Sequence, residues 1–210
     1  SGHKGILKGV VIIYFFKVLL KRENRREFIL ISYLLLLVTV SFFFVLFDSQ
    51  FLGSLLIRRL FFVPAFLNFS YIEFFSGNDL VYWSNGVLSS LIEYPYSLQP
   101  TYLIGEFVGS RDMSANTGFL ANGYMHLGYL GIVFYTLLSV FIFNIINTLG
   151  KRIDKFLVMA ITFLPIHSLF MGSDLFTTLL THGLMVSIII IYLFENKDYY
   201  LVFGSKKLKL

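Results

Sequence analysis

Residues 28–47 read FILISYLLLLVTVSFFFVLF, an almost wholly apolar stretch without a charged side chain. A helix rises about 1.5 Å per residue, so about 20 apolar residues cross a hydrocarbon core roughly 30 Å thick. Lipid offers no hydrogen-bond partner to backbone amides, so such a segment must be helical. The stretch therefore predicts a transmembrane helix and, with it, an integral membrane protein.

The composition of the whole chain agrees with this prediction. Of 210 residues, 57% are hydrophobic and 14% are charged, and the mean hydropathy is +0.77, values far from those of an ordinary soluble domain. The chain has no cysteine, which excludes a disulfide framework and thiolate metal sites. Short basic clusters beside the apolar runs explain the net charge of +5 better than nucleic-acid binding does.

The basic clusters also predict a topology. The sequence KRENRRE at residues 21–27 has four positive side chains directly before the apolar stretch, which indicates the cytoplasmic side. A basic turn at residues 150–155 and the lysine-rich tail indicate the same side, so we expect the C-terminus in the cytoplasm. The predicted fold is an all-α polytopic transmembrane bundle with about five spans, at residues 5–20, 28–47, 124–147, 156–171 and 175–194.

An apolar stretch of a different kind follows at residues 51–75. It contains Arg58 and Arg59, which are costly at the middle of a bilayer, and Pro64, which breaks or kinks a helix. We expect it at the outer interface or as a re-entrant pair of short helices. Residues 77–115 are predicted to be an external loop with short helices of its own.

The predicted domain organisation is a single integral-membrane domain over residues 1–210, which we expect to be the C-terminal part of a longer protein. Residues 48–117 form its extracytoplasmic or interfacial segment. The first apolar run is interrupted by Lys8 and Lys17, whose long side chains reach the membrane surface if they lie towards its opposite ends.

The stretch RDMSANTGFLANGYMHLGYLG, residues 111–131, brings polar residues and glycines against an apolar run. A helix beginning near Gly118 puts Asn122 and His126 on one face as it leaves water. The plainer interpretation of His126 is an interfacial hydrogen-bonding residue. Three glycines leave gaps through which another backbone, or a lipid-linked ligand, can come close: Gly123, Gly128 and Gly131.

The chain has no motif of a soluble enzyme, and its four histidines lack close metal-ligand spacing. The predicted outer face combines cations, a titratable histidine, carboxylates and many aromatic rings. Guanidinium groups suit phosphate oxygens, and aromatic faces suit sugar rings or isoprenoid tails. The inventory fits a polyprenyl-linked sugar or phospholipid-like substrate, although arginines and aromatic residues also serve as plain membrane anchors.

Two segments resemble a known family. RRLFFVPAFLNFSYIEFFSGND at residues 58–79 and SANTGFLANGYMHLGYLG at residues 114–131 resemble the C-terminal half of bacterial oligosaccharide repeat-unit polymerases, the O-antigen or capsule polymerases of the Wzy type. The initial SGHKG resembles the Ser-Gly-x-Arg-Gly segment before a span in that family, with Lys4 where an arginine is usual. The resemblance implies a multi-pass enzyme of the bacterial inner membrane, in capsule or lipopolysaccharide synthesis, without metal or cofactor.

The implied reaction is a glycosyl transfer on the extracytoplasmic side. A growing glycan moves from undecaprenyl pyrophosphate to the terminal sugar of a new lipid-linked repeat unit. Such a transfer needs cations for the departing pyrophosphate and a base for the acceptor hydroxyl. The candidate catalytic residues are His126, Glu73 and Asp112. The candidate substrate-binding residues are Lys4, Arg58, Arg59, Arg111, Asn116, Asn122, Tyr71 and Trp83.

The expected partners are the undecaprenyl-pyrophosphate-linked oligosaccharide, membrane lipid, a chain-length regulator and a flippase, and not nucleic acid. Three alternative functions remain open. An O-antigen ligase performs the same chemistry on a lipid A acceptor. A flippase or transporter of lipid-linked oligosaccharides would line a central cavity with cations, although the predicted spans here are nearly free of charge. A non-catalytic membrane subunit would use the outer loop to dock a partner.

Overall fold

The computed structural model describes residues 2–21, 24–47, 51, 53–86, 88–195, 200–203 and 206–209. The regular secondary structure of this part of the chain is helical, apart from a short antiparallel hairpin of β1 (Tyr200–Phe203) and β2 (Lys206–Lys209). The helical elements in chain order are α1 (Gly2–Leu20), α2 (Arg25–Phe47), the π-helix η1 (Gly53–Phe62), α3 (Val63–Ser76), α4 (Pro100–Phe107), α5 (Phe119–Leu149), the 3-10 helix η2 (Gly150–Arg152), α6 (Lys155–Met171), α7 (Leu175–Leu180) and α8 (Leu184–Glu195).

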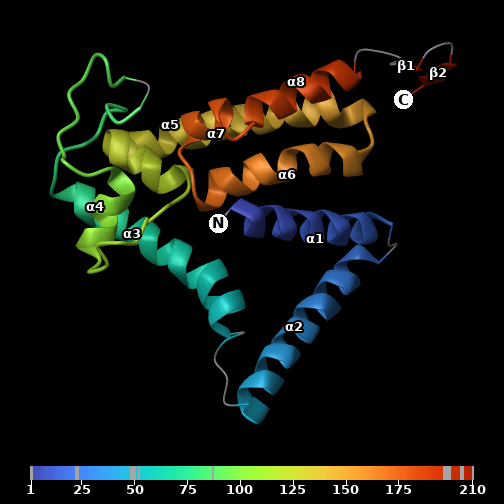
Figure 1. Ribbon diagram of the computed structural model, residues 1–210, viewed down its shortest axis with the longest axis horizontal. Helices are drawn as coiled ribbons and strands as arrows, with labels where there is room; N and C mark the ends of the chain where they lie inside the picture. Colours follow the sequence, from blue (N-terminus) through green and yellow to red (C-terminus); the bar gives the residue numbers. More distant parts are fainter. Residues whose placement is uncertain are drawn as a thin grey trace.

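The helices α1, α6 and α8 and most of α5 run side by side (Figure 1), with α1 against α6, and α6 and α5 against α8. Helix α2 leaves this bundle at an angle. The turn between α1 and α2, and η2 between α5 and α6, lie at one end of the bundle, whereas α4 and the long loops lie at the opposite end. The two basic turns of the sequence therefore share one end.

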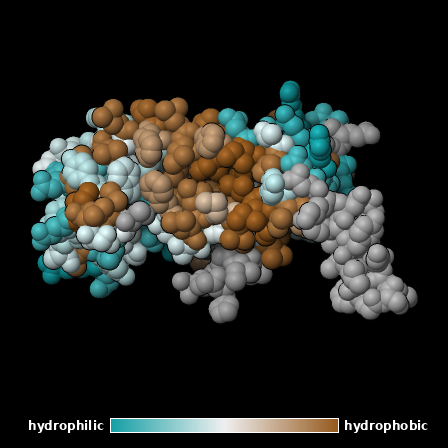
Figure 2. Space-filling model, turned by 90° about the horizontal axis from the view of Figure 1, so that it is seen from above, coloured by the Kyte–Doolittle hydropathy of each residue, from teal (hydrophilic) through white to brown (hydrophobic). Residues whose placement is uncertain are grey.

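Two helices are long and apolar enough to cross a membrane, Arg26–Leu46 within α2 and Phe119–Arg152 over α5 and η2. Three shorter apolar helices accompany them, Gly9–Leu20, Lys155–Met171 and Leu184–Glu195. Figure 2 shows a broad hydrophobic band across the middle of the molecule, with hydrophilic residues at both ends. The helix predicted over residues 28–47 is confirmed as α2, which begins at Arg25.

The span predicted over residues 175–194 is not one continuous helix in the structure. The chain forms α7 and then α8, with a break at Thr181, His182 and Gly183 between them. Gly183 has φ of +84°, a left-handed conformation that glycine adopts without the steric cost other residues bear. His182 is consequently exposed in the break and does not lie inside a helix.

The arginine-containing stretch forms η1 followed directly by α3, without a turn between them, and its placement at an outer interface or as a re-entrant pair stays a prediction. Pro64 lies in the first turn of α3, directly after η1, where the backbone changes from π-helical to α-helical. The loop after α3 contains the short helix α4, which begins with a proline, Pro100, and this confirms the expectation of helical structure within the loop.

Helix α5 begins after Gly118, as predicted, but it is kinked at Leu127 and Gly128, where Gly128 has φ of +60°. The part beyond the kink, residues 129–149, measures about 31 Å at 1.5 Å per residue, enough for a hydrocarbon core of about 30 Å. The helix predicted from residue 124 is therefore divided, because residues 119–126 form a separate short segment before the kink.

Glycines allow the two parts of α5 to meet. A Cβ atom added to Gly131 would lie only 1.8 Å from the carbonyl oxygen of Gly123. A Cβ atom added to Gly118 would lie 2.0 Å from the carbonyl oxygen of Phe170. The predicted gaps at Gly123 and Gly131 are thus confirmed as places of close backbone approach, and the approaching backbone is the other half of the same helix.

The kink also lies between two apolar clusters. One cluster joins α3, α4, the adjoining loops and the first part of α5: Leu67, Tyr71, Phe75, Val81, Ile104, Ala115, Ala121, Tyr124 and Met125. The second joins α5 to α6, α7 and α8: Phe119, Tyr135, Ile142, Ile146, Leu169, Leu175, Leu184 and Ile191. Polar residues collect where these two clusters come together.

Candidate functional site

The segment before α5 is held in an extended form against α3 and α4. The backbone N–H of Ala115 donates to the carbonyl oxygen of Thr101 at 2.9 Å, and the Tyr71 hydroxyl donates to the carbonyl oxygen of Ala115 at 3.1 Å. The Thr117 hydroxyl donates to Asn68 Oδ1 at 3.2 Å. Burial raises the pKa of Tyr71, so its hydroxyl stays a neutral donor that holds this segment in place.

Four residues from distant parts of the chain form what we call the His126 network: Trp83, His126, Tyr135 and Asp174. The backbone N–H of Trp83 donates to His126 Nδ1 at 3.0 Å, and His126 Nε2 lies 3.4 Å from Asp174 Oδ2. The Tyr135 hydroxyl donates to the same oxygen at 2.7 Å, and Trp83 Nε1 donates to that hydroxyl at 2.6 Å. The network joins the loop after α3 to α5 and to the turn before α7.

His126 is held on all sides in this network. Its side chain is 2% exposed, and its ring stacks on Trp83 with 5.0 Å between centroids. Nδ1 accepts a hydrogen bond, so in the neutral imidazole the proton is on Nε2, which faces Asp174. Neither nitrogen is open to a substrate proton, so this geometry favours a positioning role for His126, while its catalytic role stays a prediction.

Asp174 begins α7. Its Oδ1 accepts from the backbone N–H of Phe176 at 2.8 Å and of Thr177 at 3.4 Å, the bonds expected of a helix-capping aspartate. Burial alone would raise the pKa of this carboxyl, but hydrogen bonds from His126, Tyr135 and Phe176 outweigh it and lower the pKa. The carboxylate is therefore ionised at neutral pH.

Sequence reasoning recognised only a turn at residues 172–174 and missed Asp174 as a site residue. The available signal was an aspartate directly before an apolar helical run, which is typical of a helix start. That signal identifies a cap. It does not reveal that the second carboxylate oxygen meets His126 and Tyr135.

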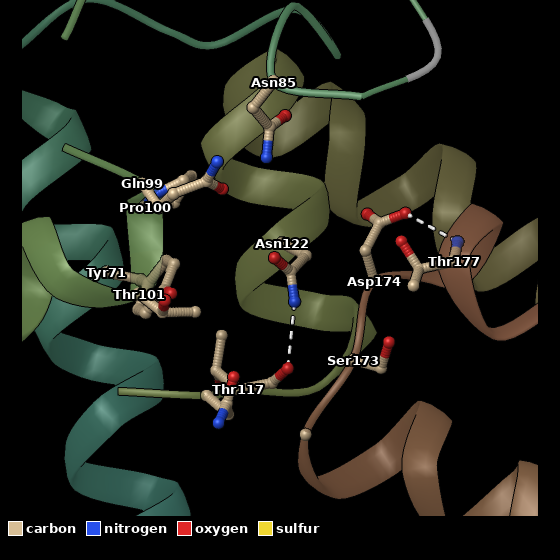
Figure 3. A pocket seen from close by; sticks show the side chains of 12 residues that line it. Tyr71, Asn85, Gln99, Pro100, Thr101, Thr117, Asn122, Ser173, Asp174 and Thr177 are labelled. Atoms are coloured by element: carbon tan, nitrogen blue, oxygen red, sulfur yellow. Dashed lines mark hydrogen bonds between the residues drawn. The ribbon is translucent and has the colours of Figure 1, made fainter. Parts of the chain in front are cut away.

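Beside Asp174 lies a polar cavity of about 160 Å³, which we call the amide pocket. Figure 3 shows Asn85, Gln99 and Asp174 around it on different sides, with Asn122 donating to the carbonyl oxygen of Thr117. The lining residues are Tyr71, Asn85, Gln99, Pro100, Thr101, Asn116, Thr117, Asn122, Gly172, Ser173, Asp174 and Thr177. Apart from Asp174, the lining is uncharged.

A second cavity of about 420 Å³, the arginine pocket, opens next to it. It is lined by Ser54, Arg58, Arg59, Val63, Leu67, Met113, Ser114 and Asn116. Asn116 also lines the amide pocket, so the two cavities adjoin. Among the described residues neither arginine has a carboxylate partner. Both arginines belong to η1. π-Helical turns are rare in proteins, and those that occur are often found at functional sites.

The structure thus brings together part of the predicted site. Arg58, Arg59 and Asn116 line the arginine pocket, and Tyr71 and Asn122 line the amide pocket. Besides Asp174, the predictions missed other polar residues of the site that no motif marks, among them Asn85, Gln99 and Tyr135.

Other predicted residues lie apart from the two pockets. Arg111 forms an exposed ion pair with Glu106, with 3.1 Å between Nε and Oε1. Glu73 and Asp112 are exposed and line neither cavity. Lys4 belongs to α1, but its side chain lies outside the described part of the chain.

The site is therefore a pair of adjoining cavities. The arginine pocket is cationic, and the amide pocket is lined by uncharged residues and Asp174. The His126 network holds Asp174 in place. Such a division suits a ligand that is itself part anion and part neutral polar group. No protein-family model, curated protein or solved structure matches this chain.

Proposed function

We propose that the protein polymerises lipid-linked oligosaccharide repeat units by glycosyl transfer from undecaprenyl pyrophosphate. The observation that carries the proposal is the wall shared by the two pockets at Asn116. A sugar linked to pyrophosphate has the same division into a charged part and a neutral ring. The amide pocket suits the sugar, and the arginine pocket suits the pyrophosphate.

The arginine pair supplies what the leaving group requires. In the transfer, the oxygen of the acceptor hydroxyl bonds to the anomeric carbon of the donor sugar, while the bond from that carbon to the pyrophosphate oxygen breaks. The electron pair leaves with the pyrophosphate, and Arg58 and Arg59 stabilise the added negative charge. Fixed donors at a developing charge typically contribute a factor of 10² to 10³ each to the rate.

The proton of the acceptor hydroxyl needs an acceptor as well. Asp174 is the carboxylate that lines the amide pocket, whereas Glu73 and Asp112 line neither pocket. We assign the proton to Asp174, and we assign to His126 and Tyr135 the positioning of that carboxylate through their contacts with Oδ2. Four donors already contact the two oxygens of Asp174, so one of the two 3.4 Å contacts, from His126 or Thr177, must lengthen when the carboxylate accepts the substrate hydroxyl.

The proposal includes a multi-pass arrangement in the bacterial inner membrane with the two pockets on the extracytoplasmic side and the C-terminus in the cytoplasm. Its support is the hydrophobic band of Figure 2 and the position of the basic turns at the end of the bundle opposite α4. Positive residues are enriched on the cytoplasmic side of membrane proteins.

Gel analysis of surface glycan tests the function. A deletion strain should lose the ladder of long polymers and keep a band with a single repeat, and the wild-type gene should restore the ladder. Loss of every transferred repeat would indicate a ligase or a flippase instead. Complementation with Arg58→Ala, Arg59→Ala or the double variant should fail to restore the ladder at an unchanged level of protein in the membrane.

Arg152→Ala is the matched control, because Arg152 is an exposed arginine of η2 at the opposite end of the bundle. It should restore the full ladder. Arg111→Ala tests the sequence-based assignment of Arg111, which on this geometry should also restore it. A normal ladder from the Arg58→Ala/Arg59→Ala double variant would contradict the proposal.

A further inference from the structure

We infer that the amide pocket binds a single uncharged sugar residue through its hydroxyl groups and discriminates against acidic sugars. The inference rests on the proposed function and deepens it, since it specifies the class of sugar that this site accepts. It depends on three observations: unused hydrogen-bonding groups, the size of the cavity and the charge of its lining.

Several polar side chains face the cavity without a partner. The side chains of Asn85, Gln99, Asn116 and Thr101 make no hydrogen bond to the part of the chain that the structure describes. A carboxamide offers two donors and an acceptor, and a threonine hydroxyl offers both functions. Polar groups of this kind are satisfied by water or by a ligand, and a sugar hydroxyl both donates and accepts.

The fixed groups of the pocket complement these unused ones. The side-chain amide of Asn122 donates to the carbonyl oxygens of Thr117 and Gly118. These bonds hold the start of α5 beside the cavity. Asp174 keeps an ionised carboxylate at one side. The pocket therefore presents rigid acceptors beside free amides, so that several hydroxyl groups of one ring find partners at once.

The volume of the cavity, about 160 Å³, suits a ligand of about one ring. Pockets that enclose whole drug-sized ligands start near 300 Å³. An oligosaccharide therefore enters with one residue, and the rest of the chain stays outside the cavity.

The charge of the lining excludes acidic sugars. Among the described residues that line the cavity there is no arginine, lysine or histidine, and Asp174 is the one charged member. A sugar carboxylate would meet an ionised carboxylate without a cation to offset it, and like charges at such short range repel strongly in a partly buried site. The adjoining arginine pocket suits anionic groups, so the neutral part and the anionic part of the ligand bind in different cavities.

The chain carries its own probe for this binding. Trp83 is the single tryptophan of the sequence, and its indole belongs to the His126 network. Asn85, two residues further along the chain, lines the pocket. Occupation of the pocket should therefore change the fluorescence of Trp83.

The experiment is a fluorescence titration of the full chain in detergent micelles with glucose, galactose, rhamnose and N-acetylglucosamine, and with glucuronate and galacturonate. At least one neutral sugar should give a saturable change below 100 mM, whereas the two acids should give none. Asn85→Ala and Gln99→Ala should each weaken the binding about tenfold. Asn147→Ala, an exposed asparagine near the other end of α5, should leave it unchanged.

Three results would overturn the inference: no saturable change with any neutral sugar, equal binding of the acidic sugars, or equal affinity in the two pocket variants and the wild type. The titration involves no turnover, and the Arg58→Ala/Arg59→Ala double variant should still bind the neutral sugar. Sugar binding without a polymer ladder would reject polymerisation alone. A ladder that depends on the arginines, without sugar binding, would reject the inference alone.

Discussion

Helices α2 and α5 pass the same test of length and hydropathy, but they have different surroundings. The apolar window of α2 has a mean hydropathy of 2.7 and is not buried at all, whereas that of α5 has 2.1 and is 28% buried. In α2, the hydroxyls of Ser32 and Thr39 donate to carbonyl oxygens of their own helix, those of Phe28 and Leu35. The polar side chains of α5 include His126 and Tyr135, which reach other elements.

The comparison distinguishes two kinds of apolar helix, one suited to lipid on all sides and one that contacts the rest of the chain. A helix that is apolar on every side is suited to a lipid environment, and hydropathy alone is enough to predict it from the sequence. Polar residues within such a helix are costly unless they are paired, so they indicate where the chain contacts itself. In α5 they mark the candidate site.

The largest expected effect on stability is that of a side chain added where the two parts of α5 meet. In Gly131→Ala the new Cβ atom would meet the carbonyl oxygen of Gly123 at 1.8 Å, a backbone atom that cannot move aside cheaply. We expect a loss of about 3 kcal/mol or more in the free energy of unfolding, measured by thermal unfolding in detergent. Gly77→Ala is the control, because nothing lies within 4 Å of its added Cβ. Equal stability of the two variants would show that the kink is not tightly packed.

The next effect concerns the anchor of the His126 network. Asp174→Ala removes a helix cap and leaves the buried groups of His126 and Tyr135 without their acceptor. The expected loss is roughly 2 to 3 kcal/mol. Asp154 caps α6 through the N–H of Leu157 but has an exposed side chain, so Asp154→Ala should cost only about 1 kcal/mol. If both variants lost the same amount, the network would add nothing to the cap.

A smaller effect follows from the lowered pKa of Asp174. The folded state holds this proton less tightly than the unfolded state, so Asp174 contributes stability above its ordinary pKa of 3.8 and loses it as the pH falls through the lower folded value. The stability difference between the wild type and Asp174→Ala should therefore shrink below about pH 4. Denaturant unfolding from pH 3 to 7 measures this, and a constant difference would contradict it.

The smallest expected effect is on the surface of α2. Leu35 is 62% exposed, so Leu35→Ala should change the free energy of unfolding by less than about 0.5 kcal/mol. Ile142 of α5 is 4% exposed, and Ile142→Ala should cost about 2 to 5 kcal/mol. The same unfolding measurement compares them, and a large loss in Leu35→Ala would mean that α2 packs against protein.

The sequence by itself determined the apolar helices and several of their ends. Hydropathy predicted α2, and the glycine and the apolar run after it predicted the start of α5. The loop over residues 77–115 was predicted to contain short helices, and α4 is one of them. These features depend on neighbouring residues, because helix propensity, capping and transfer into lipid act over a few turns of chain.

Only the tertiary structure decided the breaks and the pairing of distant side chains. Gly128 and Gly183 have positive φ angles at the two breaks in the helices, and the packing of the flanking helices selects these conformations. The packing of the helices also brings Asp174 to His126 and places Asn116 between the two pockets. Glu73 and Asp112 line neither pocket. Such contacts depend on how α3, α5 and the turn before α7 pack in space, and no local pattern encodes that arrangement.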